Sequence, residues 1–487
     1  MRLSDLAPDE GVRLVGDPAT EVGGLSADSR TVRPGDLFAA LSGSRADGRR
    51  FVAGALARGA VAVLGDASLA EAGLSVPVLA APDPRRALAL VAARFYGAQP
   101  RHIAAVTGTS GKTSTASFVR QLWIRLGRKA ASIGTLGIEA PGRAPTPALT
   151  TPDPVELHRT LAELAREGVD RVCLEASSHG LDQRRLDGLR IEAAAFTNLT
   201  RDHYDYHGTA EAYLAAKRRL FDTLLPAGAT AVLNADVPEF APLRAVARER
   251  GLRLIDFGRE AESLRLLAVE PHAHGQRVVL EAFGRRHAVD SRLVGTFQAH
   301  NVLAALGLVL ACGEDVDAVR PHLTALAAPP GRMQLAAHHP SGAPAFVDYA
   351  HKPEALAKAL ETLRPHTPGR LVVVFGCGGD RDTGKRPQMG EIAARLADRV
   401  VVTDDNPRTE DPAAIRRAIL AAAPGAAEIG DRAEAIATAF ADLRTGDALL
   451  VAGKGHEPYQ IVGERVLPFD DAEVLRRCAR DAGGRAA

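Results

Sequence analysis

A glycine-rich loop between a short apolar strand and a helix constrains the fold of this chain more than any other segment. Residues 103–106 (Ile-Ala-Ala-Val) predict a buried strand, residues 107–113 read Thr-Gly-Thr-Ser-Gly-Lys-Thr, and residues 114–126 predict a helix. This order directs backbone N–H groups and the positive end of the helix toward a phosphate. The amine of Lys112 would reach the outer phosphates and the hydroxyl of Thr113 would bind Mg²⁺. The loop has two residues between its glycines where the general phosphate-binding loop has four, so a tight turn without a ligand is the alternative.

Short apolar runs alternate with helix-like stretches along all 487 residues. This alternation is typical of α/β domains built on largely parallel sheets. Two breaks rich in glycine, proline and alanine, at residues 96–100 and 327–331, divide the chain. We therefore expect an α/β fold of three domains. These are a smaller α/β domain over residues 1–99, a central domain over 100–329 with a parallel sheet like that of phosphate-loop ATPases, and a Rossmann-like domain over 330–487.

The charge balance and the apolar pattern argue against several classes of protein. The chain carries 60 basic and 59 acidic side chains, and a near-neutral protein lacks the electrostatic surface of a general nucleic-acid binder. No apolar run approaches the ~20 residues of a membrane span, and the N-terminus shows no secretion signal. The four cysteines are scattered singly, which argues against a disulfide framework or a zinc site. We expect a cytoplasmic monomer without a nucleic-acid or membrane partner.

Lysine is rare in this chain, and its positions indicate where an amine has been kept. Of the 60 basic residues only seven are lysines, at positions 112, 129, 217, 352, 358, 385 and 454. A compositional bias toward arginine explains the count. Under such a bias, a remaining lysine can mark a place for a compact ammonium or a nucleophilic amine, since arginine does not deprotonate.

Two further apolar strands of the central segment run into polar loops. Residues 171–175 end in Glu175, and residues 193–196 lead into a loop with two histidines and two aspartates within residues 202–207. A carboxylate at the carboxyl end of a strand beside a phosphate loop suits Mg²⁺ binding. The His–Asp cluster indicates a polar site or capped, structural imidazoles. The following helix, predicted over residues 210–221, carries Lys217, and a helical lysine taken alone is most often a solvated charge.

Four motifs taken together resemble those of one enzyme family. They are Gly-Thr-Ser-Gly-Lys-Thr (108–113), Glu-Ala-Ser-Ser-His-Gly-Leu (175–181), His-Tyr-Asp-Tyr-His-Gly (203–208) and Gly-Thr-Phe-Gln-Ala-His-Asn (295–301). They occur in the order seen in Mur ligases, which build the peptide stem of the bacterial cell wall. The resemblance extends from Asp28 to Glu457 and is strongest to the branch that adds diaminopimelate to UDP-N-acetylmuramoyl-L-alanyl-D-glutamate. It implies an ADP-forming acid–amino-acid ligase of peptidoglycan synthesis, with roles in cell-wall biogenesis, cell shape, cell division and the cell cycle.

The resemblance also implies a mechanism and a catalytic centre. ATP would phosphorylate the terminal side-chain carboxylate of the D-glutamate, and the amine of diaminopimelate would displace phosphate from the acyl phosphate. The implied catalytic residues are Lys112, Glu175, His203 and Lys217. The implied Mg²⁺ ligands are Thr113, Glu175, His203 and Lys217, the last as a carbamate (N6-carboxylysine), a modification that arginine could not undergo.

Substrate contacts follow from the same resemblance, residue by residue. The ATP contacts are Gly108, Thr109, Ser110, Gly111, Lys112, Thr113, Ser114, Asn301, Arg332 and Asp348. The UDP-substrate contacts are Ser29, Ser44, Arg45, Ala46, Thr150, Thr151, Ser177, Gln183 and Arg185. The diaminopimelate contacts are Arg381, Asp405, Asn406, Pro407, Arg408, Gly453 and Glu457.

Three apolar strands of the last third end in polar loops, which bears on the choice of amino acid. The strand and loop pairs are 371–375 with 376–382, 400–402 with 403–408, and 449–452 with 453–457. In a parallel sheet these loops share the edge where ligands bind. That edge would offer Arg381 and Arg408 to carboxylates and Glu457 to an ammonium, which suits diaminopimelate better than lysine. Structural salt bridges at the loop bases are the alternative.

Other functions remain open at this point. A lysine-adding Mur ligase would lack the arginine of the Asp-Asn-Pro-Arg loop (405–408). A ligase similar to folylpolyglutamate synthase would share the ATP chemistry, but it has no reason to carry that loop or the N-terminal UDP-type segment. A nucleotide-dependent switch or binding module would need neither a carbamate at Lys217 nor an amino-acid site. No role is assigned to Lys352, Lys385, Lys454 or Cys377.

Overall fold

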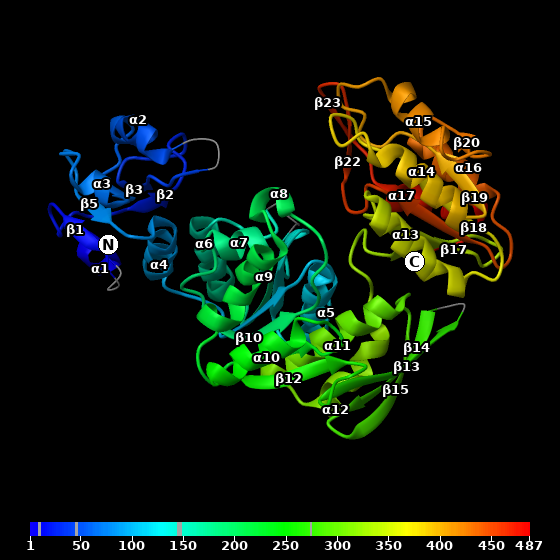
Figure 1. Cartoon of the computed structure of the whole chain (residues 1–487), viewed down its shortest axis with the longest axis horizontal. Coiled ribbons are helices and arrows are strands. Elements are labelled where there is room, and N and C mark those ends of the chain that lie inside the picture. Colours follow the sequence, from blue (N-terminus) through cyan, green and yellow to red (C-terminus); the bar gives the residue numbers. More distant parts are fainter. Residues whose placement is uncertain (8–10, 44–46, 144–148, 273–274) are drawn as a thin grey trace. The chain divides into compact units, whose positions relative to one another are not determined.

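Large sheets of mostly parallel strands, with helices on their faces, give the chain the α/β class that the sequence predicts (Figure 1). The structure is a computed structural model, and it describes residues 1–7, 11–43, 47–143, 149–272 and 275–487. Within these residues the chain separates into two compact units. The first unit holds residues 1–264 and 303–319, and the second holds residues 265–302 and 320–487.

The N-terminal part of the first unit is a small sheet with helices on both faces. Its elements are α1 (Leu3–Leu6), β1 (Arg13–Val15), β2 (Gly24–Ser26), β3 (Asp36–Ala39), η1 (Gly48–Phe51), α2 (Val52–Ala57), β4 (Ala62–Gly65), α3 (Ala67–Ala70), β5 (Val78–Ala80) and α4 (Pro84–Tyr96). The strands lie in the order β1-β5-β4-β3-β2 and are parallel except for β1. Buried residues of α1 and α4 pack on one face and those of α2 and α3 on the other, so this part has a core of its own.

The central sheet of the first unit places three strand ends side by side. Its elements are β6 (His102–Thr107), α5 (Lys112–Arg125), β7 (Ala130–Gly134), β8 (Gly137–Glu139), α6 (Pro154–Arg166), β9 (Arg171–Glu175), α7 (Ser178–Asp182), β10 (Ile191–Phe196), α8 (Tyr204–His207), α9 (Ala210–Arg219), η2 (Leu220–Leu224), β11 (Thr230–Asn234), α10 (Phe240–Glu249) and β12 (Arg253–Gly258). The strands run in the order β12-β11-β10-β6-β9-β7-β8, all parallel except β8. Because β6 lies between β9 and β10, the loops after these strands leave the same edge, where the strand order reverses.

Apolar packing makes this sheet a rigid support for its loops. Residues of α6 and α10, such as Leu161 and Leu243, share one buried cluster with the strands. Helix α5 contacts β6, β7 and β9 and fully buries Trp123, the single tryptophan of the chain. Helix α11 (Thr296–Ala311) contributes residues 303–311 to the first unit, which also contains α12 (Val316–Val319).

The second unit carries a sheet of parallel strands between two layers of helices (Figure 1). Its further elements are β13 (Leu264–His272), β14 (Gly275–Ala282), β15 (Arg285–Ser291), η3 (Arg320–Ala325), β16 (Gln334–His338), β17 (Pro344–Asp348), α13 (Pro353–Leu363), η4 (Arg364–His366), β18 (Leu371–Phe375), α14 (Lys385–Leu396), β19 (Arg399–Val402), α15 (Pro412–Leu420), β20 (Ala427–Glu428), α16 (Arg432–Ala441), β21 (Ala448–Ala452), β22 (Tyr459–Val462), β23 (Arg465–Pro468), α17 (Asp471–Ala482) and β24 (Arg485–Ala486). The order is β20-β19-β18-β21-β17-β16-β24, parallel from β20 to β17. Helices α13, α14 and α15 cover one face and α16 and α17 the other.

The strand order of this sheet brings together the three polar loops predicted to share an edge. Strand β18 pairs in parallel with β19 on one side and with β21 on the other. The loops 376–382, 403–408 and 453–457 follow these three strands, so they leave the sheet at the same edge.

The predicted elements around the loops agree with the structure except at their ends. Helix α5 begins at Lys112 rather than at Ser114, because Gly111 adopts a left-handed conformation (φ +90°) and the helix starts directly after it. Helix α9 ends at Arg219 and is followed by one π-helical turn, where the sequence predicts a helix through residue 221. None of the helices in the described ranges is both long and apolar enough to cross a bilayer.

A fully buried salt bridge in the second unit yields a stability prediction. Arg432 Nε and Asp471 Oδ1 are 2.7 Å apart, and neither side chain has exposed surface. Removing one partner leaves an unpaired buried charge, so Asp471→Asn should lower the free energy of unfolding by about 3–5 kcal/mol, measured by urea denaturation. Glu473 lies on the same helix as Asp471, but its pair with Arg480 is exposed. Glu473→Gln should therefore leave the urea midpoint of unfolding unchanged. Equal midpoints for the two variants would contradict this assignment.

Candidate active site

The phosphate loop is held in place by the segment that follows β10. Gly108 has a φ of +143°, and a Cβ there would lie 1.9 Å from the hydroxyl oxygen of Thr197. The Ser110 N–H donates to Oδ1 of Asn198 (3.0 Å), and Nδ2 of Asn198 donates to the Ser110 carbonyl (3.1 Å). Only glycine therefore fits at position 108, and the loop conformation depends on Thr197 and Asn198.

Helix α5 begins inside the phosphate loop, so its first backbone N–H groups point toward the expected phosphate position. Nζ of Lys112, the first helical residue, donates to the carbonyls of Gly108 (2.8 Å) and Thr109 (2.9 Å). Thr113 and Ser114 follow in the first turn, and both are buried. The first N–H groups of a helix have no partner within it, so a phosphate at this end would meet backbone donors and an ammonium together.

Glu175 brings a buried carboxylate to the phosphate loop, as its place at the end of β9 predicts. The residue is 2% exposed. Its Oε2 accepts a hydrogen bond from the Thr113 hydroxyl (3.0 Å), and its Oε1 accepts one from the backbone N–H of Thr135 (2.8 Å). Carboxylate and hydroxyl oxygens are hard ligands of the kind that Mg²⁺ prefers, so Glu175 and Thr113 fit the expected metal.

Lys217 is buried against the phosphate loop, and its helical position does not make it a solvated charge. The residue is 1% exposed, and its Nζ donates to the Gly108 carbonyl (2.7 Å), which also accepts from Lys112 (2.8 Å). Burial and the charge of Lys112 hold the pKa of the Lys217 amine well below its ordinary value, although Asp202 raises it. A depressed pKa increases the fraction of neutral amine, which is the nucleophilic form.

His203 is exposed, whereas the other three predicted catalytic residues are buried or half-buried. It adopts a left-handed conformation (φ +54°), its Nε2 lies 3.5 Å from Oδ2 of Asp202, and its ring centre lies 4.9 Å from that of His179. Across the described ranges, no three His, Cys, Asp or Glu side chains are grouped closely enough to hold a metal ion. The predicted ligand set contains only two residues of these types, so it depends on Thr113 and on a modified Lys217 as well.

The predicted UDP-substrate contacts of the central segment form one hydrogen-bonded network beside Glu175. The Thr151 hydroxyl donates to the Glu175 carbonyl (2.7 Å) and lies 3.0 Å from the Ser177 hydroxyl. Nη1 of Arg185 donates to the Thr151 carbonyl (2.6 Å), and its Nη2 donates to Oε1 of Gln183 (2.7 Å). The hydroxyl of Thr150 lies 3.1 Å from that of Thr135. Ser29 is in the turn after β2, and Ser44, Arg45 and Ala46 lie outside the described residues.

Three predicted nucleotide contacts lie together in the second unit. Nδ2 of Asn301 donates to Oε1 of Gln298 (3.0 Å), whose Nε2 donates to the Arg332 carbonyl (3.4 Å). The guanidinium of Arg332 stacks over the ring of Tyr349 at 4.8 Å from its centre. Burial raises the pKa of Asp348 to about 6, although the charge of Arg332 lowers it. Asn301, Arg332 and Asp348 are therefore parts of one network.

The loops at the edge of the second sheet join most of the predicted diaminopimelate contacts. Nδ2 of Asn406 donates to Oε2 of Glu457 (3.0 Å). Arg408 has a φ of +51°, and its Nη1 donates to the Gly379 carbonyl (2.8 Å), which ties the second loop to the first. Arg381 is exposed and donates to the Asp380 carbonyl of its own loop (3.1 Å), so in the described part of the chain it is not joined to Asn406 or Glu457.

Comparison with known proteins identifies the family. Family models match three successive parts: "Mur ligase family, catalytic domain" over residues 21–96, "Mur ligase middle domain" over 106–309, and "Mur ligase, glutamate ligase domain" over 331–455. The UDP-N-acetylmuramoyl-L-alanyl-D-glutamate--2,6-diaminopimelate ligase of Mesorhizobium japonicum is 55% identical over 99% of both chains. The chain belongs to the Mur ligase family. The protein of the same name from Caulobacter vibrioides is 55% identical over 93% of this Mur ligase and 95% of that protein.

Solved structures agree with this assignment. A structure of a UDP-N-acetylmuramoyl-L-alanyl-D-glutamate--2,6-diaminopimelate ligase covers 99% of both chains with a TM-score of 0.76 at 34% identity. MurF of Thermotoga maritima in complex with ADP covers 94% of this Mur ligase and 97% of that chain (TM-score 0.61, 21% identity). Folylpolyglutamate synthase of Mycobacterium tuberculosis with ADP covers 74% and 90% (TM-score 0.60, 21% identity). The MurF and folylpolyglutamate synthase structures share the fold of this chain.

Two residues that support the phosphate site of this Mur ligase were not singled out from its sequence, and a third residue, Lys454, was named there without a role. Asn198 and Thr197 fix the phosphate loop, and their signal is their position directly after the strand beside β6. Lys454 is fully buried between the second and third loops of the other unit. Its signal is the rarity of lysine together with its place in a strand-end loop.

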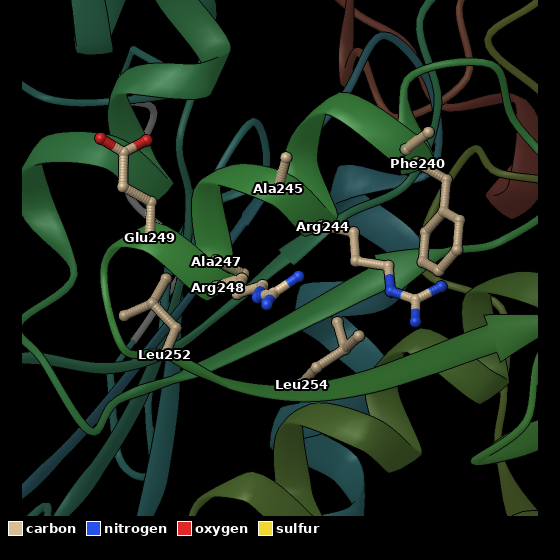
Figure 2. Close-up of a pocket in the computed structure, with 9 residues that line it drawn as sticks. Phe240, Arg244, Ala245, Ala247, Arg248, Glu249, Leu252 and Leu254 are labelled. Atoms are coloured by element: carbon tan, nitrogen blue, oxygen red, sulfur yellow. The ribbon is translucent and has the colours of Figure 1, made fainter.

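A hollow in the first unit is separate from all of these residues. It has a volume of about 890 Å³ and lies along α10 and β12, with Phe240, Leu252 and Leu254 among its lining residues (Figure 2). The other lining residues are Ala241, Arg244, Ala245, Ala247, Arg248 and Glu249. None of the predicted site residues lines it, so the hollow is not the phosphate site.

The close approach at Gly108 predicts the effect of a single methyl group. In Gly108→Ala the new Cβ would collide with Thr197 and displace the loop, and a displacement of about 1 Å in an active site can lower activity ~100-fold. We therefore expect ATP-dependent phosphate release to fall by about that factor. Gly54→Ala is the control, because a Cβ there lies 3.6 Å from Nη1 of Arg58, an ordinary contact. Wild-type rates in both variants would show that the loop tolerates the displacement.

Proposed function

We propose that this Mur ligase joins diaminopimelate to UDP-N-acetylmuramoyl-L-alanyl-D-glutamate and converts ATP to ADP and phosphate, as a cytoplasmic monomer in peptidoglycan synthesis. The observation that carries the proposal is the contact of Asn406 with Glu457 beside Arg408, at one edge of the second sheet. An arginine suits a carboxylate and a glutamate suits an ammonium. The names of relatives that are 55% identical over nearly the whole chain support the same substrates.

The proposed division of labour follows three segments of the chain. Residues 1–99 bind the UDP group, with Ser29 and residues 44–46 among the contacts. Residues 100–329 bind ATP and the reacting carboxylate, and residues 330–487 bind the amino acid. The network of Thr151, Ser177 and Arg185 would hold the peptide end of the UDP-substrate near Glu175, because the Thr151 hydroxyl is already bonded to the Glu175 carbonyl.

ATP would be held by the phosphate loop and by the network around Asp348. Lys112 and the N–H groups of α5 meet the phosphates, while Asn301 and Arg332 contact the rest of the nucleotide. Thr113, Glu175, His203 and carbamylated Lys217 would hold Mg²⁺. A bound Mg²⁺ would offset the repulsion between the anionic triphosphate and the anionic carboxylate.

The carbamate at Lys217 is proposed from the family resemblance, and the burial and lowered pKa of the Lys217 amine support it. A neutral amine attacks CO₂, forms an N–C bond and loses one proton, which leaves an anionic carbamate. In the unmodified chain the amines of Lys217 and Lys112 both donate to the carbonyl of Gly108. When both amines are protonated, two like charges lie beside each other. Carbamylation would replace one of these cations with an anion, so the repulsion would become attraction and Lys217 would become an oxygen ligand.

The reaction proceeds in two displacements. An oxygen of the D-glutamate carboxylate attacks the γ-phosphorus of ATP, and the bond from that phosphorus to the ADP oxygen breaks. The amine of diaminopimelate then attacks the carbonyl carbon, the bond to the phosphate oxygen breaks, and the nitrogen loses a proton. Lys112 stabilises negative charge on the phosphates, while Arg408 and Glu457 hold the diaminopimelate through a carboxylate and an ammonium.

A phosphate-release assay separates this function from its alternatives. The full chain is given ATP, Mg²⁺ and the UDP-dipeptide, with diaminopimelate, lysine or no amino acid. We expect sustained release only with diaminopimelate. Release with lysine would favour a lysine-adding ligase, and release that ignores both substrates would favour a nucleotide-dependent switch.

Arg408 tests the amino-acid assignment within the same assay. Loss of a hydrogen bond to a charged group typically lowers affinity ~10- to 100-fold, so Arg408→Ala should raise the KM for diaminopimelate by about that factor. The KM for ATP should stay within about twofold, since Arg408 is not among the proposed ATP contacts. Arg417→Ala is the control, because that side chain is 71% exposed on α15. Equal changes in both KM values would argue against the role of Arg408.

The carbamate can be observed directly. With ¹³C-bicarbonate, the wild-type chain should show a ¹³C NMR carbamate signal that is absent from Lys217→Met. Lys129→Met should retain the signal, because Lys129 is exposed and is not one of the proposed Mg²⁺ ligands. Phosphate release should also fall in Lys217→Met and stay normal in Lys129→Met. A signal that persists in Lys217→Met would assign the carbamate to another lysine.

A further inference from the structure

Lys454 is a lysine without exposed surface in a loop whose backbone leaves little room. The residue is 0% exposed and lies between Gly453 (φ +118°) and Gly455 (φ +56°). A Cβ on Gly453 would lie 2.6 Å from Oδ2 of Asp405, and one on Gly455 would lie 2.7 Å from the Cβ of Tyr349. The two glycines thus let the loop 453–457 approach its neighbours closely, and the lysine between them points inward.

The ammonium of Lys454 lies among three acceptors from two loops. Its Nζ donates to Oδ1 of Asn406 (2.9 Å) and lies 3.6 Å from Oδ1 of Asp405 and 3.9 Å from Oε2 of Glu457. A buried charge is tolerated only when it is paired and hydrogen-bonded. The three protons of an ammonium suit this arrangement, whereas the larger planar fork of arginine would need more space.

These contacts determine the orientation of the Asn406 amide. Its Oδ1 faces two donors, Nζ of Lys454 (2.9 Å) and the backbone N–H of Ile461 (3.0 Å). Only the oxygen end of an amide can accept both hydrogen bonds, so the nitrogen end must face the other way. There Nδ2 donates to Oε2 of Glu457 (3.0 Å).

We propose that Lys454 is a positioning residue of the amino-acid site: it fixes the amide of Asn406 and supplies positive charge that keeps Glu457 an anionic acceptor for the ammonium of diaminopimelate. The inference rests on the proposed function, since it assumes that this edge binds the amino acid. It extends the site to a residue that does not itself touch the substrate. Lys454 joins Asn406 and Asp405 of one loop to Glu457 of the other, so the substrate would meet one preformed surface.

The charges around Glu457 explain why this lysine matters. Burial raises the pKa of Glu457, while the hydrogen bond from Asn406 and the charges of Lys454 and Arg408 lower it, and Asp405 raises it. Arg432, Tyr349 and Tyr459 also face this carboxyl group. Without Lys454 the pKa of Glu457 should rise. Because only the carboxylate accepts from an ammonium, activity would then be lost at a higher pH as the solution is acidified.

The test is Lys454→Met in the full-length chain, with diaminopimelate as the varied substrate. We expect the KM for diaminopimelate to rise ~10-fold or more, while the KM values for ATP and the UDP-dipeptide change less than about twofold. The acidic limb of kcat/KM for diaminopimelate should move to higher pH. Lys358→Met is the control, because Lys358 is exposed on α13 and outside the site. An unchanged KM and an unchanged acidic limb in folded Lys454→Met would overturn the proposal.

A second variant decides the question if Lys454→Met does not fold. Asn406→Asp keeps an oxygen for Lys454 but replaces the donor that faces Glu457 with a second acceptor. It should raise the KM for diaminopimelate and move the acidic limb to higher pH, and the absence of both changes would also overturn the proposal. If the wild-type chain uses another amino acid, the proposed function fails. The same variants, measured with that amino acid, still decide the role of Lys454.

Discussion

The burial of lysine amines against loops that follow parallel strands is the constraint on which both sites depend. Lys217 reaches the Gly108 carbonyl from α9, and Lys454 reaches Asn406 from the loop after β21. A buried amine needs acceptors at fixed positions, because water cannot replace them. Each lysine therefore holds a loop in one conformation, and each of these loops belongs to a proposed ligand site. The apolar packing of the surrounding α/β layers therefore maintains the local order of both sites.

Glycines make this burial possible by letting neighbouring loops approach each other. At Gly108 a Cβ would reach the Thr197 hydroxyl, and at Gly453 it would reach the Asp405 carboxylate. Both glycines have positive φ values, which side chains rarely adopt. Both strand-end loops thus contain the same three features. Each has a glycine that lies close to a neighbouring loop, a lysine beside or behind that glycine, and an acidic or amide side chain from the adjacent strand end.

The local sequence pattern was sufficient to predict the helices and strands around the sites, and the site residues that directly follow strands. The order of strand, glycine loop and helix predicted Lys112 and Thr113 beside a phosphate position, and the end of β9 predicted Glu175.

Contacts between distant segments were not visible in this way. Lys217 and Gly108 are 109 residues apart, and only the contacts of α9 with α7 and with the phosphate loop show that this helical lysine is buried. Asn198 escaped notice and Lys454 received no role for the same reason, because hydrogen-bond partners across loops leave no periodic signal. The family resemblance supplied Lys217 where local reasoning favoured solvent.

The two buried lysines differ in what surrounds them, and this difference separates their chemistry. Burial lowers the pKa of Lys454 and the charge of Arg432 lowers it further, but the nearby carboxylates of Asp405 and Glu457 oppose this and favour the charged amine. For Lys217, burial and the like charge of Lys112 both lower the pKa, and the charge of Asp202 opposes them. The first environment suits an ammonium that orients other groups, and the second suits a neutral amine that can react. Arginine could take neither place, since its fork is too large for the first and does not deprotonate in the second. Only seven of the 60 basic residues of the chain are lysines, and these two positions are among those where arginine would not serve the proposed function.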